Sequence, residues 1–231
     1  MLLEQLFRVD GTSLIVPNSD PIRALPPPRN ISIVCSNGQM RVIETSLPGV
    51  LLLEPRVFSD DRGWFAEVFN ESTFRAAGLP DSFVQDNQSF SKRSVLRGLH
   101  YQLGKPQGKL VRALSGHIFD VAVDLRRDSP HFGKWAGFDL TGDTLQFLWI
   151  PEGFAHGFLV LSETATVLYK TTNLYHPAGE RCIRWDDPTI NIAWPQVPCS
   201  ADGDASSLAP LVSGKDAEGA LFKDAELPPV G

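Results

Sequence analysis

The sequence has few cysteines and no long apolar run, and these absences exclude several classes of protein. The three cysteines, Cys35, Cys182 and Cys199, are odd in number and far apart. They predict neither a disulfide framework nor a cysteine-rich metal site. No apolar stretch approaches the roughly 18 residues that a membrane-spanning helix needs, and the N-terminus lacks the basic start and apolar core of a signal peptide. We therefore expect a reduced, cytoplasmic protein with no membrane partner.

Net positive charge is also lacking. The formal net charge is −6 at pH 7, which disfavours general binding to nucleic acids. An anionic ligand must then be met by a local cluster of basic residues. The length of 231 residues suits one domain with a sizeable core, or one domain with tails.

The first 39 residues differ from the rest of the chain. They include the proline-rich stretch SDPIRALPPPRN and show little periodicity. From Met40 the pattern changes to MRVIETSLPGVLLLEPRVF, in which apolar runs are broken by a Pro-Gly turn. We expect residues 1–39 to be a poorly ordered N-terminal extension, or the product of a misassigned start codon. The compact domain is then predicted to span residues 40–231.

Residues 41–196 consist mostly of short runs rich in Val, Ile, Leu, Thr and aromatic residues, separated by Gly, Pro, Asn and Asp. About ten strands with such frequent turns favour an antiparallel sandwich or barrel. The run HIFDVAVDLR alternates between two faces. One face carries Phe119, Val121, Val123 and Leu125, and the other carries Asp120, Ala122 and Asp124.

Two short helical segments are predicted outside the strands. The first covers residues 70–79, NESTFRAAGL, with Asn70 as N-cap and Gly78 as C-cap. The second is a single helical turn within residues 213–222, SGKDAEGALF.

Two histidines stand in apolar, glycine-flanked surroundings, His100 in LRGLHYQ and His156 in EGFAHGF. A buried polar group is costly unless it is paired or used, so each is either a core histidine satisfied by a neighbour or a functional group. Strand alternation in the first motif predicts one face with Leu96, Gly98 and His100, and another with Arg97 and Leu99.

Metal binding is one functional alternative for His100. Metal-binding barrels often use a His-x-His pair with a nearby carboxylate and a distant histidine. Here Gln102 stands where the second histidine would be, and Lys109 stands near the place of the carboxylate. An ammonium group has no lone pair to donate and repels a dication. The sequence therefore predicts no catalytic metal and no cofactor.

A metal-free cavity that contains His, Lys and Tyr suits another chemistry. Removal of a proton from a carbon beside a ketone needs a base near neutral pH, and His is the usual one. The enolate needs a fixed positive charge near its oxygen, and inversion needs a separate acid on the opposite face. The chain has three tyrosines, Tyr101, Tyr169 and Tyr175. This composition permits racemisation or epimerisation without requiring it.

The motifs carry a specific resemblance. Seven motifs occur in a fixed order over residues 40–228: DDRGWFAEVF, QDNQSFS, LRGLHYQ, QGKLVRALSGHIFDVAVDLRRDSPHFGKW, WIPEGFAHGF, YKTTNLY and DDPTINIAWP. In order and spacing they are similar to the dTDP-4-dehydrorhamnose 3,5-epimerase family. The resemblance implies an all-β, cupin-like jelly-roll barrel with a few short helices, which forms a homodimer and needs no metal. It also implies inversion of both carbons that flank the C4 ketone of dTDP-4-dehydro-6-deoxy-D-glucose.

The resemblance also implies catalytic roles for four residues. His100 resembles the general base, Lys109 the cation beside the C4 oxygen, and Tyr169 the acid on the opposite face. Asp216 resembles the carboxylate that orients the histidine. Two alternatives stay open: Ser213-x-x-Asp216 also has the spacing of a helix capping box, and Asp120 is a rival partner for His100.

Substrate contacts are implied for a further set of residues: Arg62, Glu67, Gln85, Asn87, Arg97, His156, Tyr175, Glu180 and Lys215. In the family, the residues that correspond to Arg62 and Glu67 contact the nucleotide bound by the other subunit of the dimer. The residue that corresponds to Tyr175 stacks on thymine. Cationic side chains such as Arg97 suit a pyrophosphate. Glu180 and Lys215 lie outside the tightest motifs and are equally well explained as surface charges.

Two other functions compete with the 3,5-epimerase. One is a relative that inverts a single carbon of a similar keto-sugar nucleotide, which the catalytic residues alone do not distinguish. The other is a non-catalytic sugar-nucleotide-binding barrel, which predicts loss of the base or the acid, whereas His100, Lys109 and Tyr169 are all present.

Overall fold

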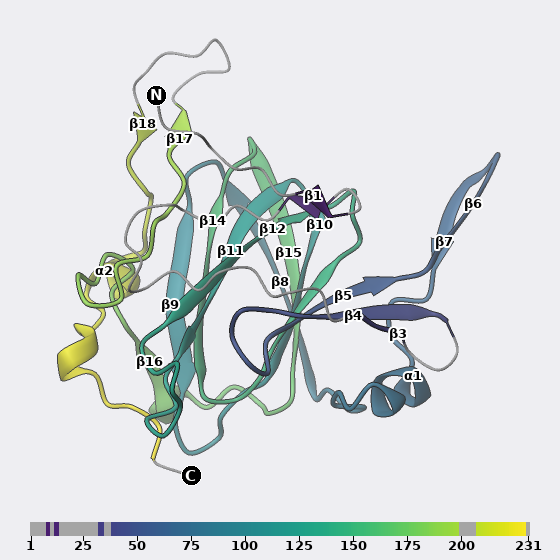
Figure 1. Cartoon of the computed structure of the whole chain (residues 1–231). Coiled ribbons are helices and arrows are strands. Elements are labelled where there is room, and N and C mark those ends of the chain that lie inside the picture. The colour runs from purple at the N-terminus through teal and green to yellow at the C-terminus, as the bar shows by residue number, and fades with distance from the viewer. Residues whose placement is uncertain (1–7, 10–11, 14–31, 35–37, 199–206, 230–231) are drawn as a thin grey trace.

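The computed structural model describes residues 8–9, 12–13, 32–34, 38–198 and 207–229. Among these residues, two antiparallel sheets face one another (Figure 1). The first has the strand order β3 (Ser32–Val34), β4 (Met40–Glu44), β5 (Leu51–Pro55), β13 (Phe147–Ile150), β10 (Lys109–Ser115), β15 (Thr164–Thr171) and β8 (Gln85–Lys92). The second has the order β12 (Trp135–Thr141), β11 (His117–Asp124), β14 (Phe154–Val160), β9 (Leu96–Gln102) and β16 (Glu180–Cys182). This is the jelly-roll architecture that the family resemblance implies, and it agrees with the antiparallel sandwich or barrel predicted from the strand pattern.

Shorter elements surround the two sheets. Strand pairs outside them are β1 (Arg8–Val9) with β2 (Thr12–Ser13), β6 (Val57–Asp60) with β7 (Gly63–Ala66), and β17 (Val197–Pro198) with β18 (Ser207–Leu208). The described helices are α1 (Glu71–Ala76), α2 (Gly214–Ala217) and the 3₁₀ turns Pro177–Gly179 and Phe222–Asp224. None of these described helices is long and apolar enough to cross a membrane.

The core between the sheets follows from the two-residue alternation of the strands. In β10, Val111 and Ala113 belong to the central core, whereas Leu110 packs on the outer face with Phe74 of α1. Lys109 has the same parity as Val111, so it points between the sheets at the end of the strand. The inner face of β10 therefore changes from apolar to cationic along its length.

The alternation predicted for residues 117–126 is confirmed. Phe119, Val121, Val123 and Leu125 belong to one apolar cluster on the outer face of the second sheet, which residues 183–194 and 222–227 cover. Ala122 belongs to the central core instead. Asp120 shares the parity of Ala122 and therefore faces the space between the sheets.

The first predicted helix is confirmed with a shift of one residue at its end. The Asn70 side chain accepts hydrogen bonds from the backbone N–H groups of Ser72 and Thr73, at 2.9 and 3.2 Å. The C-cap is Ala77, not Gly78, and Gly78 follows it with φ +71°. A residue with positive φ commonly follows the cap of a helix, and glycine adopts it without steric cost.

The alternation predicted for LRGLHYQ is wrong. Arg97 and His100 both line one pocket, although they are three residues apart. The β9–β14 register gives the reason, because Arg97 lies opposite Phe158 whereas His100 lies opposite His156. The three residue steps from Arg97 to His100 in β9 therefore span the same length as the two steps from Phe158 to His156 in β14. This β-bulge shifts the alternation by one residue, so Arg97 and His100 point to the same face of the sheet. Gly98 sits at the bulge, where an added Cβ would lie 2.5 Å from the Cα of Gly157.

Part of the predicted N-terminal extension is paired with the first sheet. Strand β3 pairs with β4 through the register Ser32 to Ile43, Ile33 to Val42 and Val34 to Arg41. Residues 8–9 and 12–13 pair with each other. The other residues of the predicted extension up to residue 37 lie outside the described residues, so the domain boundary at Met40 stays a prediction.

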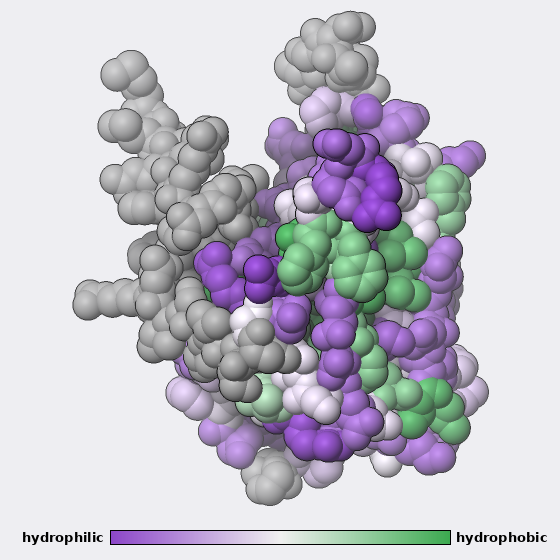
Figure 2. Space-filling view, turned by 90° about the vertical axis from the view of Figure 1, so that its right-hand side faces the viewer, coloured by the Kyte–Doolittle hydropathy of each residue, from purple (hydrophilic) through white to green (hydrophobic). Residues whose placement is uncertain are grey.

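The β6–β7 hairpin projects far from the two sheets (Figure 1). Its exposed apolar side chains include Trp64 and Phe65, which are 60% and 67% exposed, together with Val57 and Phe58. Figure 2 views the molecule from the side on which the hairpin projects and shows an apolar cluster near the middle of that face, below a group of polar residues. A group of large exposed apolar side chains is typical of an interface.

A chain that begins at Met40 tests the boundary. We expect it to fold, with a melting temperature about 2–4 °C lower, because losing the β3–β4 ladder costs about 1 kcal/mol in a domain of this size. Differential scanning calorimetry gives the measurement. A matched chain that begins at Ser32 and keeps β3 should melt like the full-length protein. A fall of more than about 10 °C on truncation at Met40 would show that the extension is an integral part of the domain.

Candidate active site

A pocket opens between the two sheets at their polar end. Seven of the predicted site residues line it: Arg97, His100, Lys109, His156, Tyr169, Tyr175 and Glu180. They come from β9, β10, β14, β15, β16 and the segment after β15. The pocket therefore collects side chains from both sheets.

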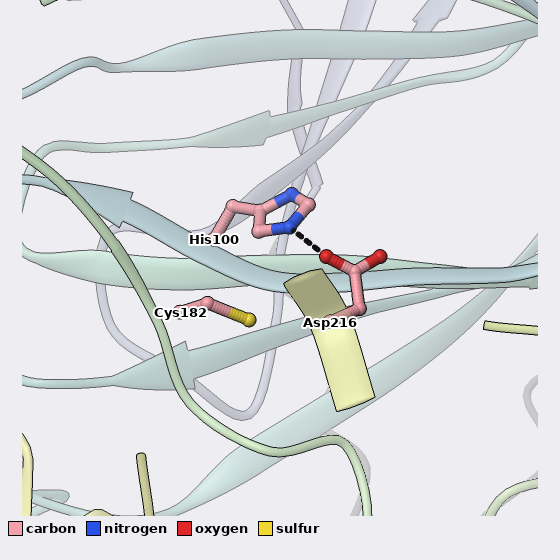
Figure 3. Close-up of side chains that lie close together, drawn as sticks. All are labelled: His100, Cys182 and Asp216. Atoms are coloured by element: carbon pink, nitrogen blue, oxygen red, sulfur yellow. Dashed lines mark hydrogen bonds and ion pairs between the residues drawn. The ribbon is translucent and has the colours of Figure 1, made fainter. Parts of the chain in front are cut away.

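Asp216 is the carboxylate that contacts His100. Its Oδ1 lies 2.6 Å from Nε2 of His100, and the Gly98 N–H donates to Oδ2 at 3.5 Å (Figure 3). Burial alone would raise the pKa of Asp216, but the hydrogen bond and charge of His100 outweigh it, so the pKa is below its ordinary value. Asp216 is thus ionised and holds the proton of the imidazole on Nε2, which leaves Nδ1 free to accept another.

The capping-box interpretation of Ser213-x-x-Asp216 is also correct. Ser213 is the N-cap of α2, and its Oγ accepts a hydrogen bond from the backbone N–H of Asp216 at 3.1 Å. The Asp216 side chain bonds to His100 and Gly98 as well as to the Ser213 side chain. One motif therefore starts the helical turn and aims the carboxylate.

Asp120, the rival partner, pairs with His156 instead. Both of its carboxylate oxygens lie 3.0 Å from Nε2 of His156, and both side chains are buried. Burial lowers the pKa of His156, an effect that Asp120 opposes. His156 is therefore a neutral imidazole that donates to Asp120. The two histidines each have a carboxylate of their own.

Lys109 is a buried cation at the floor of the pocket. Its Nζ donates to the backbone carbonyl of His100 at 3.2 Å. Burial lowers the pKa of Lys109 to about 8, against the attraction of Asp120 and Glu180. The ammonium is therefore charged at neutral pH and loses its charge as the pH rises through about 8.

Tyr169 enters the pocket from the sheet opposite His100. It lies on β15 of the first sheet, next to Lys109 on β10, whereas His100 lies on β9 of the second. Burial raises the pKa of Tyr169, and the nearby Arg97 opposes the shift. The phenol therefore keeps its proton at neutral pH and is available as a donor.

The rim holds a cluster of charged and polar groups. The Tyr175 hydroxyl donates to Glu180 at 2.5 Å, and Lys215 forms an ion pair with the same carboxylate. Burial would raise the pKa of Glu180, but the hydrogen bonds from Lys215 and Tyr175 bring it below its ordinary value. Glu180 and Lys215 are thus joined to the pocket rather than being isolated surface charges.

Gln85 and Asn87 stand beside the pocket on β8. Gln85 donates to Asn87 at 2.9 Å, and its Oε1 accepts the backbone N–H of Tyr175 at 2.9 Å. They are not among the described residues that line the pocket. Arg97 does line it, and its Nε donates to Ser91 at 3.1 Å.

Arg62 and Glu67 lie away from the pocket of their own chain. Arg62 is in the turn of the β6–β7 hairpin and forms an ion pair with Asp60 at 2.5 Å. Glu67 follows β7 and accepts a hydrogen bond from Asn70 at 3.2 Å. Neither is among the described residues that line the pocket.

Several groups at the site were not picked out from the sequence. Ser89 and Gln107 line the pocket, and Ser89 Oγ is buried with no hydrogen-bond partner among the described residues. The two-residue step from Gln85 and Asn87 along β8 leads to Ser89, so the period of the strand was the available signal. Gln102, where a metal-binding histidine would stand, instead accepts the backbone N–H of His176 at 2.8 Å.

Cys182 lies behind His100. The two residues are directly paired between β16 and β9, and the ligand atoms of His100, Cys182 and Asp216 all lie within 4.8 Å of one another. Burial raises the pKa of Cys182 to about 12, with a further contribution from Asp216. The thiol is therefore protonated and a poor nucleophile.

Comparison with known proteins identifies the family. The sequence model of the family described as dTDP-4-dehydrorhamnose 3,5-epimerase matches residues 44–224. The dTDP-4-dehydrorhamnose 3,5-epimerase of Pseudomonas aeruginosa is 54% identical over 188 residues, which are 81% of this chain and 98% of that protein. The chain belongs to this family.

Solved structures of epimerases share the fold. The dTDP-6-deoxy-D-glucose-3,5-epimerase of Legionella pneumophila, solved in complex with dTDP-4-keto-L-rhamnose, is 42% identical with a TM-score of 0.76, over 83% of this chain and 99% of that one. ChmJ, a 3'-monoepimerase of Streptomyces bikiniensis in complex with dTDP-quinovose, is 33% identical with a TM-score of 0.68, over 78% of this chain and 89% of that one. The predicted family and fold are confirmed.

Proposed function

We propose that this chain inverts C3 and C5 of dTDP-4-dehydro-6-deoxy-D-glucose and so makes dTDP-4-dehydro-L-rhamnose. The observation that carries the proposal is the placement of His100 and Tyr169 on opposite sheets, with one pocket between them. Inversion of a carbon needs proton removal on one face and proton delivery on the other. A base and an acid that face each other across a cavity meet this requirement.

The reaction at each carbon follows from the three groups. Nδ1 of His100 takes the proton from the carbon beside the ketone while Nε2–H stays bonded to Asp216. The electrons pass to the C4 oxygen, where the ammonium of Lys109 stabilises the enolate. Tyr169 then delivers its phenolic proton to the opposite face of the carbon. Exchange with solvent restores the neutral histidine and the phenol.

The remaining polar groups suit the nucleotide part of the substrate. Arg97 offers a guanidinium for the pyrophosphate. Tyr175, half exposed at the rim, presents a ring on which thymine stacks, and Glu180 with Lys215 holds that ring in place. His156 lines the pocket, and Gln85, which bonds to Asn87, supports the backbone of Tyr175 at the rim. A cytoplasmic location of the enzyme stays a prediction.

Inversion of a single carbon is the second candidate function. The similarity of fold to ChmJ, a 3'-monoepimerase, favours keeping it. The higher identity to 3,5-epimerases supports inversion of both carbons. Proton NMR in deuterated water separates the two, because label at C3 and C5 supports the first and label at one carbon supports the second.

A second copy of the chain completes the proposed site. The β6–β7 hairpin exposes apolar side chains, holds Arg62 in its turn and projects away from the two sheets. We infer a homodimer in which the hairpin packs on the partner and brings Arg62 and Glu67 to the partner's nucleotide. Burial of exposed rings such as Trp64 provides the driving force.

Because His100 is the proposed base and Tyr169 the proposed acid, substitutions at the two positions should affect deuterium exchange and inversion differently. In His100→Asn, neither deuterium exchange nor inversion should occur, with a loss of about 10²–10⁴-fold. In Tyr169→Phe, His100 still forms the enolate, so deuterium should enter with retained configuration while inverted product falls sharply. NMR in deuterated water scores label and configuration separately at C3 and C5. Equal loss of exchange and inversion in Tyr169→Phe would contradict the role of Tyr169 as acid.

The buried ammonium predicts an alkaline limit to turnover. Because burial lowers the pKa of Lys109 to about 8, its charge is present below that pH, and kcat should fall as the pH rises through it. Lys109→Met should lower kcat by about 10²–10³-fold at neutral pH. The remaining kcat of this variant should not fall as the pH rises through about 8. Lys105→Met, a change of an exposed lysine in the neighbouring loop, serves as the control. A wild-type kcat that stays constant from pH 7 to about 10, where an ordinary lysine titrates, would contradict the lowered pKa, and an unchanged kcat in Lys109→Met would rule Lys109 out as the cation.

Complementation tests the shared site. Arg62→Ala/Glu67→Ala chains and His100→Asn chains should each be nearly inactive alone. Co-expressed, they should recover about a quarter of wild-type activity, since half of randomly assembled dimers are mixed and each has one intact site. If Arg62 and Glu67 serve their own chain, mixed dimers have no intact site and no activity returns. Purification through two different tags isolates the mixed dimers.

A further inference from the structure

Cys182 has no part in the proposed reaction, yet it lies beside the two residues that form its base. Its Sγ, a ring nitrogen of His100 and a carboxylate oxygen of Asp216 lie within 4.8 Å of one another. The three residues come from separate elements, β16, β9 and α2, and Figure 3 shows them converging on one point. We propose that they form an inhibitory binding site for a thiophilic divalent cation such as Zn²⁺.

The donor set matches that cation. Thiolate, imidazole and carboxylate are the three ligand types that bind Zn²⁺, with a water as the fourth ligand. Hard cations such as Mg²⁺ prefer oxygen ligands and six-fold coordination, so they should bind poorly here. One thiolate and one carboxylate cancel the two positive charges of the ion. The thiol proton is released to solvent on binding.

Binding requires the three donor atoms, now within 4.8 Å of one another, to move to tetrahedral spacing. Tetrahedral coordination with bonds of about 2.0–2.3 Å places ligand atoms about 3.3–3.6 Å apart. Nε2 and Oδ1 are now 2.6 Å apart, so the ion replaces their shared proton and separates them slightly. The nearest cations are already engaged: Lys215 pairs with Glu180, and Lys109 donates to the His100 carbonyl.

The position of the ion predicts how inhibition occurs. Of the three ligands, His100 lines the substrate pocket, whereas Cys182 and Asp216 are not among the described residues that line it. Nδ1 of His100 lies on the side of the ring away from both (Figure 3). A neutral imidazole that binds metal through Nε2 carries its proton on Nδ1. The base is then blocked while the pocket stays open to substrate.

The first measurement is inhibition by Zn²⁺ of the chelator-treated enzyme. We expect kcat to fall with little change in KM, no effect of Mg²⁺, and recovery when a chelator is added. Cys182→Ser should raise the inhibitory Zn²⁺ concentration at least about tenfold, because a hydroxyl is a poor ligand for this ion. The matched control is Cys35→Ser/Cys199→Ser, which keeps Cys182 as the one cysteine in the sequence and should stay as sensitive as wild type.

The second measurement does not depend on the proposed role of His100 in catalysis. Co²⁺ added without substrate should give the charge-transfer absorption of a thiolate ligand in wild type and in Cys35→Ser/Cys199→Ser, and none in Cys182→Ser. If the Co²⁺ absorption is seen but Zn²⁺ does not inhibit turnover, the three residues bind a metal and the proposed inhibition is wrong. Absence of the absorption in wild type, inhibition through KM alone, or equal Zn²⁺ sensitivity in Cys182→Ser would overturn the site.

Discussion

The hydrogen bond between His100 and Asp216 joins parts of the chain that are 116 residues apart. An ionised carboxylate that is 4% exposed is costly unless other groups satisfy it. Here His100 and the Gly98 N–H do so, and Ser213 fixes the helical turn that delivers the carboxylate. The proposed base is therefore oriented only when the C-terminal segment is docked on the second sheet.

The interior of the barrel sets the second constraint. The same face of β10 carries Val111 and Ala113 in the core and Lys109 at the pocket. Burial of an ammonium opposes its charge, and the carboxylate of Asp120, held by His156, supplies a compensating field. The polar end of the barrel is thus a balanced set of charges rather than a group of independent side chains. The nearby carboxylates keep Lys109 cationic at neutral pH, although burial lowers its pKa to about 8.

Much of the framework could be predicted from local pattern. The alternation of residues 117–126, the N-cap at Asn70 and the helical turn after Ser213 are local properties, because each depends on residues close in the chain. The change in β9, by which Arg97 and His100 point to the same face, does not depend on nearby residues alone. It arises where Gly98 meets Gly157 on the next strand, at a bulge that only the β9–β14 register reveals. The choice between Asp120 and Asp216 as partner of His100 was open for the same reason.

The sequence by itself determined the kinds of groups available, their order, and the family to which they belong. The resemblance of its motifs to the family implied which residues serve as base, cation and acid in the proposed reaction. The tertiary structure alone decided which carboxylate meets which histidine, that His100 and Tyr169 face each other, and that Cys182 lies beside His100. These relations depend on strand register and on packing between distant segments, and no spacing along the chain encodes them directly.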